Sequence, residues 1–202
     1  ACMLALFLIG GATSLWSEYQ PNPTLNNPAV EQTAPLEGKE TRFGTTGTVL
    51  WSVTTTAASN GSVNGMQDSL SPLSGMVALV NMMVGEVIFG GVGAGMYGML
   101  LNVLIAVFLA GLMIGRTPEY LGKKLQAREV QLLVVTLLVM PVGVLVLSSI
   151  AASLPGPAGA ISNPGPHGFS QLLYAYTSAS ANNGSAFAGL GANTTFHNLM
   201  LG

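Results

Sequence analysis

Apolar runs of different lengths alternate with polar segments along the 202-residue chain. Residues 130–152 form an apolar run long enough to cross a bilayer, whereas residues 1–16 are shorter than the roughly 20 residues that a crossing needs. Because the chain opens and closes inside apolar runs, we expect its first and last helices to be truncated and the chain to be part of a larger membrane protein.

Two further apolar segments, residues 43–56 and 167–181, are too short to cross, and each runs directly into a polar segment of small residues. These polar segments read TTTAASNGS at 54–62 and TSASANNGS at 177–185. Irregular backbone at membrane depth is tolerated only where protein or a water-filled cavity surrounds it. We therefore expect two re-entrant pore half-helices, each followed by an irregular loop.

The longest apolar stretch, residues 76–115, contains Glu86 as its only charged residue. As one straight helix it would measure roughly 60 Å, about twice the ~30 Å hydrocarbon core. The middle offers only a glycine run without charges, so two crossings with a hydrated turn do not fit. We predict one crossing that is broken at Gly90–Gly98.

Charge is concentrated in the connecting segments. Residues 116–129 hold four of the six basic residues, which by the positive-inside rule predicts a cytoplasmic loop. The proline-rich, net acidic segment 18–42 and the segment 153–166 are then exposed outer loops. Lys123, Lys124 and Arg128 are expected to set orientation and meet anionic headgroups. For Arg116, loop anchoring and contact with a cytoplasmic partner both remain open.

Composition supports a membrane protein, because only 7% of the residues are charged, against roughly 25% in soluble domains. Cys2 is the only cysteine, which excludes an internal disulfide.

Gly93–Gly98 satisfies the dinucleotide-binding pattern G-x-G-x-x-G, but no strand precedes it, so we do not expect a dinucleotide site there. We expect no catalytic residues, no bound nucleotide and no nucleic-acid partner. We expect interfacial positions for His167 and His197.

An internal repeat relates the two polar segments. An offset of 123 residues places Thr54 on Thr177 and residues 60–62 on 183–185, and the flanking elements follow the same order. The fold class expected is an all-α membrane protein of channel-like repeats, each with a helix, a re-entrant pore half-helix, a filter loop and a helix. The first repeat covers residues 1–129 (outer loop 18–42, filter 55–62, broken helix 76–115, cytoplasmic loop 116–129). The second covers residues 130–202 (helix 130–152, outer loop 153–166, filter 181–185, truncated last helix).

The two polar segments have the composition of an ion path. Small residues with permissive dihedrals let consecutive carbonyl groups face one axis and replace the water shell of an ion. Gly61 and Gly184 are expected to supply positive φ, and Asn60 and Asn183 to tolerate left-handed geometry and brace the loops from behind. The alternative is a pair of helix-capping turns, since N-G-S is a common turn sequence.

Glu86 is a candidate functional residue because an ionised group inside a membrane costs at least ~2.5 to 3.5 kcal/mol on insertion scales. It is expected to act in a gate with a basic partner outside this chain, or to touch the permeating ion. A solvated edge position is the structural alternative.

Several long motifs resemble one family. They are EGKETRFG at 37–44, TTAASNG at 55–61, GEVIFGGVGAGMYGML at 85–100, AGLMIGRTPEYLGKK at 110–124, NPGPHGFS at 163–170 and NNGSAFAGL at 182–190. Together they are similar to the potassium-binding A subunits of bacterial Kdp potassium-transporting ATPases, over essentially the whole chain.

The resemblance implies the third and most of the fourth repeat of a four-repeat subunit, with a fold similar to potassium channels and to Trk/Ktr/HKT transporters. It implies potassium as the only ion at the filter, a multi-pass location in the bacterial plasma membrane and a non-hydrolytic role. The implied partners are a P-type ATPase subunit (KdpB), the small subunits KdpC and KdpF, and membrane lipid. The alternative is a passive or ion-coupled potassium transporter without an ATPase partner, and a third class is a non-conducting scaffold.

Site residues follow from the same resemblance. The filter residues implied are Ser59, Asn60, Gly61, Asn182, Asn183 and Gly184. The gate residues implied are Glu86, Gly91, Gly93 and Gly95. Glu86 matches a carboxylate that pairs in the family with an arginine beyond this chain. Relatives carry cysteine where this chain has Asn60, so backbone rather than side-chain coordination is expected there.

Overall fold

The computed structural model describes residues 2–21 and 34–202 and is almost entirely helical. The part of the predicted outer loop at 22–33 lies outside the described residues. The helices are α1 (Cys2–Glu18), α2 (Gly44–Ala57), α3 (Pro72–Met83), α4 (Gly98–Ile114), α5 (Ala127–Ser153), α6 (Pro155–Ala158), α7 (Pro166–Ser180) and α8 (Thr195–Leu201). A 3₁₀ turn, η2, covers Gln67–Ser69, and a π-helical segment, η3, covers Val92–Tyr97.

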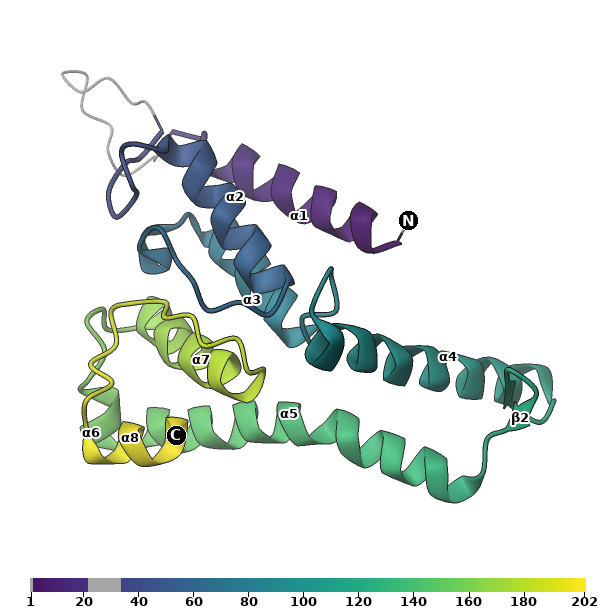
Figure 1. Ribbon diagram of the computed structural model, residues 1–202. Helices are drawn as coiled ribbons and strands as arrows, with labels where there is room; N and C mark the ends of the chain where they lie inside the picture. Colours follow the sequence, from purple (N-terminus) through teal and green to yellow (C-terminus); the bar gives the residue numbers. More distant parts are fainter. Residues whose placement is uncertain (1, 22–33) are drawn as a thin grey trace.

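The helices form a packed region and a long extension (Figure 1). Helices α1, α2 and α3 pack on one another, and α7 packs on α5 while also contacting α3. Helices α4 and α5 run outward from this region to a small hairpin at their far ends. The hairpin joins β1 (Glu119–Tyr120) to β2 (Lys123–Lys124) in antiparallel register.

Two helices are long and apolar enough to cross a membrane, Val92–Ile114 and Ala127–Ser153. Their apolar side chains are mostly exposed in this chain, as expected for helices that face lipid or further protein. The second begins with a capping box, in which Gln126 and Glu129 satisfy the free N–H groups of the first turn. It continues through Pro141 without ending.

The break predicted at Gly90–Gly98 is misplaced. The chain leaves helical structure after Met83 and is helical again from Val92, so most of the glycine run continues directly into α4. The interruption comes earlier because Gly85, Glu86 and Phe89 all have positive φ, which an α-helix cannot contain.

The predicted outer loop contains a buried ion pair. Glu18 ends α1, and its carboxylate lies 3.1 Å from Lys39 Nζ, with both side chains fully buried. The second oxygen of Glu18 accepts the backbone N–H of Ser71 at 2.6 Å, where α3 begins. The expectation of exposed acidic residues is therefore wrong for Glu18, because the free N–H groups at the start of α3 and the ammonium of Lys39 compensate its burial.

Two further charges of this loop, Glu40 and Arg42, pair with each other at the surface. Arg42 forms an ion pair with Glu40 at 3.0 Å, and the hydrogen bond from the guanidinium lowers the pKa of the Glu40 carboxyl.

The loop predicted to be cytoplasmic, residues 116–129, contains the β1–β2 hairpin. Leu121 and Gly122 at its turn both have positive φ, the conformation of a two-residue type I′ turn. Arg116, Lys123 and Lys124 are exposed here, at the end of the molecule away from α7 (Figure 1).

Candidate ion-binding site

The two polar segments meet at the centre of the molecule. Helix α2 runs into the first polar loop (residues 58–62), and α7 runs into the second polar loop (residues 181–185). A Cβ placed on Gly61 would lie only 2.7 Å from the carbonyl oxygen of Asn183 and 2.9 Å from the carbonyl carbon of Gly184. The loops are thus in backbone contact, and Gly61 is required because any side chain would fill the space that the second loop occupies.

A hydroxyl in the last turn of each helix organises the loop that follows. Thr55 Oγ1 donates to the carbonyl oxygen of Ser62 at 2.8 Å and also to that of Asn60. Ser178 Oγ donates to the carbonyl oxygen of Ser185 at 2.8 Å. These pairs are related by the same offset of 123 residues that relates the two segments in sequence.

The asparagine side chains brace the loops as the sequence predicted. Asn60 Oδ1 accepts the N–H of Ser62 at 2.7 Å, and Asn183 Oδ1 accepts the N–H of Ser185 at 3.0 Å. Both bonds run from a side chain to the backbone two residues ahead, which is the geometry of an Asx turn.

Aromatic residues that sequence reasoning missed support the same positions. Trp51 Nε1 donates to the carbonyl oxygen of Ser62 at 3.2 Å. Tyr174, at the equivalent position of α7, shares a hydrogen bond of 2.7 Å between its hydroxyl and that of Ser185, and it also bonds Gln67. Extending the 123-residue offset into the half-helices would have found this pair.

Positive φ occurs at Ser59 (57°), Asn182 (63°) and Gly184 (78°). The prediction of positive φ is therefore correct for Gly184 and wrong for Gly61. A glycine is needed at position 61 because the backbone of the second loop lies against it. Ser59 and Asn182 directly precede the two bracing asparagines. Their backbone is left-handed because the chain turns at these points, where α2 and α7 end.

Several backbone oxygens of the loops are free. Within the described ranges, no hydrogen bond reaches the carbonyl oxygens of Ser59, Gly61, Asn182, Asn183 or Gly184. Gly61, Asn182 and Gly184 are exposed in this chain, and carbonyl groups without a protein hydrogen bond are available to coordinate a cation. Because α2 and α7 both end at these loops, the negative ends of two helix dipoles also lie here.

Glu86 lies directly behind the loops. Its side chain is fully buried, and one carboxylate oxygen accepts a hydrogen bond from Asn183 Nδ2. The other oxygen has no hydrogen-bond partner among the described residues, and none of their ion pairs includes Glu86. The solvated edge position is therefore excluded within this chain, and the expected basic partner stays a prediction.

The glycines near Glu86 differ in what they allow. Gly91 and Gly93 have open space where a side chain would begin. Gly95 does not, because a Cβ there would lie 2.3 Å from the carbonyl carbon of Gly90. The close contact between Gly90 and Gly95 folds the segment after α3 back onto the start of the following helix.

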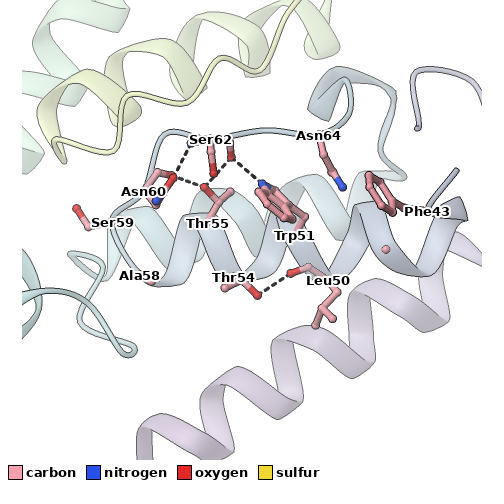
Figure 2. A pocket seen from close by; sticks show the side chains of 11 residues that line it. Phe43, Leu50, Trp51, Thr54, Thr55, Ala58, Ser59, Asn60, Ser62 and Asn64 are labelled. Atoms are coloured by element: carbon pink, nitrogen blue, oxygen red, sulfur yellow. Dashed lines mark hydrogen bonds between the residues drawn. The ribbon is translucent and has the colours of Figure 1, made fainter. Parts of the chain in front are cut away.

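An open groove of about 530 Å³ runs beside the first polar loop. Figure 2 shows Trp51 and Thr55 reaching toward Ser62 along this groove, with Asn60 at one end and Phe43 at the other. The groove therefore joins an apolar surface of α2 to the polar loop.

Polar contacts outside the loops hold α7 in place. Asp68 Oδ1 accepts from Gln171 Nε2 at 2.9 Å and pairs with His167 Nε2 at 2.7 Å, leaving the His167 side chain 46% exposed. His197 is instead fully buried, with its Nδ1 3.0 Å from the hydroxyl of Tyr176. The interfacial membrane positions expected for both histidines stay predictions.

The fold and the site define a class of protein: a helical membrane protein in which two short helices, α2 and α7, end at adjoining polar loops. Residues 1–202 match the family described as the potassium-transporting ATPase A subunit, and the chain belongs to this family. This confirms the family that the sequence motifs indicated.

Relatives from several bacteria agree. The chain is 94% identical over 201 residues to a protein of Pseudomonas fluorescens (strain SBW25) and 78% identical over 201 residues to one of Pseudomonas aeruginosa, with all of this chain covered in both. It is 58% identical over 198 residues, 98% of the chain, to a protein of Rhodospirillum centenum. All three are named potassium-transporting ATPase potassium-binding subunit. The chain spans about 36% of the length of the Pseudomonas relatives and 35% of the Rhodospirillum protein.

Proposed function

We propose that the two polar loops are two walls of a potassium-selective filter in the potassium-binding subunit of an ATP-driven uptake pump. The observation that carries this proposal is the contact between the loops, where free carbonyl oxygens of both segments lie together at the ends of two helices. The choice of potassium as the ion rests on the names of the relatives, and the coupling to ATP hydrolysis rests on the description of the family.

The chemistry of the site favours a weakly hydrated cation. Neither polar loop contains a basic side chain, while carbonyl dipoles, two helix ends and the nearby carboxylate of Glu86 all contribute negative potential. Carbonyl oxygens can replace the water shell of potassium without the strong binding that would prevent its release.

The wider architecture belongs to the same proposal. Residues 1–129 and 130–202 are two of four pore repeats in a multi-pass protein of the bacterial inner membrane, and the other two walls come from the rest of the subunit. The site residues keep their assigned roles, with Ser59–Gly61 and Asn182–Gly184 in the filter and Glu86 in a gate. A P-type ATPase subunit and small subunits complete the pump.

The test uses the full-length subunit, tagged and purified from its own bacterium with its natural partners. We expect a P-type ATPase to co-purify and its ATP hydrolysis to be stimulated by potassium and not by sodium. Gly61→Val should abolish this stimulation, because the added side chain meets the backbone of the second loop. Gly156→Ala, at a position in α6 with open space around it, should retain it. Absence of a co-purifying ATPase, or potassium stimulation that survives Gly61→Val, would overturn the proposal.

A further inference from the structure

The side-chain amide of Asn183 joins three segments of the molecule. Its Oδ1 accepts from the backbone of Ser185, and its Nδ2 donates both to the carbonyl oxygen of Thr55 at 3.1 Å and to the carboxylate of Glu86. An amide nitrogen carries two N–H groups, so both are used. Since the side chain is buried, these contacts replace water rather than compete with it. One residue thus connects the second polar loop, the end of α2 and the segment after α3.

Asn60 provides a natural comparison, because it occupies the equivalent position of the first loop. Each asparagine donates its backbone N–H to the residue five positions earlier, at 3.0 Å in both loops. Each also accepts an N–H with its side-chain oxygen. Asn60 is exposed, however, and no partner of its Nδ2 lies among the described residues. The local role is shared, and of the two asparagines only Asn183 donates to Glu86.

Glu86 depends on its hydrogen bond from Asn183. Its buried carboxylate takes part in none of the ion pairs formed by the described residues, and its backbone is held at a φ of 54° that few non-glycine residues adopt. A buried carboxyl group that loses a hydrogen-bond partner incurs the desolvation penalty of that group. Any change that displaces Glu86 therefore acts on Asn183, and the reverse is equally true.

The backbone of Asn183 is where this connection reaches the filter. Its carbonyl oxygen is free of hydrogen bonds from described residues and lies against Gly61 of the first loop. The same residue's side chain holds the carbonyl oxygen of Thr55, which also accepts the N–H of Asn60 at 3.0 Å. The Asn183 side chain therefore contacts the carbonyl group to which the first loop is anchored, while its own backbone forms part of the second loop.

We propose that Asn183 is a positioning residue that couples Glu86 to the ion-binding carbonyl groups of both polar loops, so that the hydrogen bonding of Glu86 and the affinity for potassium change together. This inference rests on the proposed function.

A double-mutant cycle in the full-length subunit, within its purified complex, tests the coupling. Asn183→Asp keeps an oxygen for the N–H of Ser185 but removes both N–H donors, and Asn60→Asp makes the same chemical change and adds the same formal charge in the first loop. Glu86→Gln supplies an N–H donor, so that in N183D/E86Q the donor and acceptor are exchanged. The half-saturating potassium concentration for ATP hydrolysis, the maximal rate and the preference for potassium over rubidium are measured for each.

We expect Asn183→Asp to raise the half-saturating concentration about 10- to 100-fold, from the loss of both N–H donors and from the second carboxyl group placed beside Glu86. Adding Glu86→Gln should recover at least about fivefold, and the rubidium preference should return toward that of the parent, whereas the effects of N60D and E86Q should multiply. If the Asn183 and Glu86 effects also multiply, or if the Asn60 cycle shows equal coupling, the proposal is wrong.

Two further measurements separate possible failures. If an aspartate variant does not assemble, Asn183→Ser and Asn60→Ser enter the same cycle, because a hydroxyl on the shorter side chain does not span to Glu86. Gly61→Ala is measured in parallel. Unchanged potassium affinity in G61A would contradict the filter itself, whereas reduced affinity in G61A together with multiplicative Asn183 effects would contradict only the coupling.

Discussion

The two polar loops have the same internal hydrogen bonds in different surroundings. In both, a hydroxyl in the last turn of the helix and an asparagine amide hold the backbone. Yet Asn60 and Ser62 are exposed, whereas Asn183 and Ser185 are buried. Bonds between residues close in sequence can be repeated wherever the short sequence recurs, while burial depends on what the rest of the chain places beside them.

The difference in burial comes from contacts made across the molecule. The second loop is enclosed by residues of the first half, since Tyr174 bonds Gln67 and Asn183 bonds Thr55 and Glu86. The first loop borders the open groove of Figure 2. In the proposed architecture this groove faces the remaining part of the subunit.

The largest loss of potassium affinity is expected from substituting alanine for Gly61 or Gly184. The two substitutions should weaken binding for different reasons. Gly61→Ala forces a Cβ within 3.0 Å of three backbone atoms of the second loop, so the loops must separate. Gly184→Ala meets no atom within 4 Å but must keep a φ of 78°, at about 1 kcal/mol. We expect about a 100-fold or greater loss of apparent potassium affinity for G61A and about 5- to 10-fold for G184A, measured as potassium-stimulated ATP hydrolysis.

Asparagine substitutions at the same two glycines test whether close contact at Gly61 and positive φ at Gly184 cause these losses. Gly184→Asn should be milder than Gly184→Ala, because asparagine tolerates left-handed backbone, whereas Gly61→Asn should be at least as severe as Gly61→Ala. Equal effects of asparagine and alanine at Gly184 would show that its positive φ is not what matters there.

The next effect concerns the aromatic supports. Tyr174→Phe leaves the buried hydroxyl of Ser185 and the oxygen of Gln67 without this partner, which should reduce stability by about 1 to 3 kcal/mol. Trp51→Phe removes one bond to a carbonyl group that Thr55 still satisfies, and Trp51 is 47% exposed, so about 0.5 to 1 kcal/mol is expected. Unfolding of the purified complex in detergent measures both. A larger effect at Trp51 would mean that the rest of the subunit buries it.

Much of this fold could be predicted from sequence because its strongest signals are local. The half-helices ending near Ala57 and Ser180 follow from apolar runs that stop at small polar residues. The bracing role of Asn60 and Asn183 follows from the preference of asparagine for bonds to nearby backbone. Neither inference needs knowledge of distant residues.

The errors concern features that depend on distant residues. Glu18 looks like a loop charge until the start of α3 and Lys39 are placed beside it. Gly61 looks like a turn glycine, but its requirement comes from the backbone of a segment more than a hundred residues away. The helix break was placed in the glycine run because glycine weakens helices, whereas positive φ at Glu86 and Phe89 interrupts the helix earlier.

Removing the organising hydroxyls should give closely similar effects in the two loops. Thr55→Val and Ser178→Ala each delete a donor to a loop carbonyl group while keeping most of the side-chain volume. We expect each to destabilise the complex by about 1 kcal/mol, the usual net contribution of such a bond. Because the bond is local in both loops but Trp51 also donates to the carbonyl oxygen of Ser62, a difference above about 1 kcal/mol, or a larger effect of Thr55→Val, would indicate that the loops are not equivalent even internally.

The smallest effect, of opposite sign, is expected at the left-handed residues before the two asparagines. Ser59 and Asn182 have φ values of 57° and 63°, where glycine is unstrained. Ser59→Gly should stabilise the complex by about 0.5 to 1 kcal/mol, and Asn182→Gly by less, since asparagine already tolerates this region. Thermal unfolding of the two variants beside Ala58→Gly, a control whose φ is −102°, measures the difference. A gain at Ala58 equal to that at Ser59 would show that flexibility of the loop, rather than relief of its left-handed turn, causes the stabilisation.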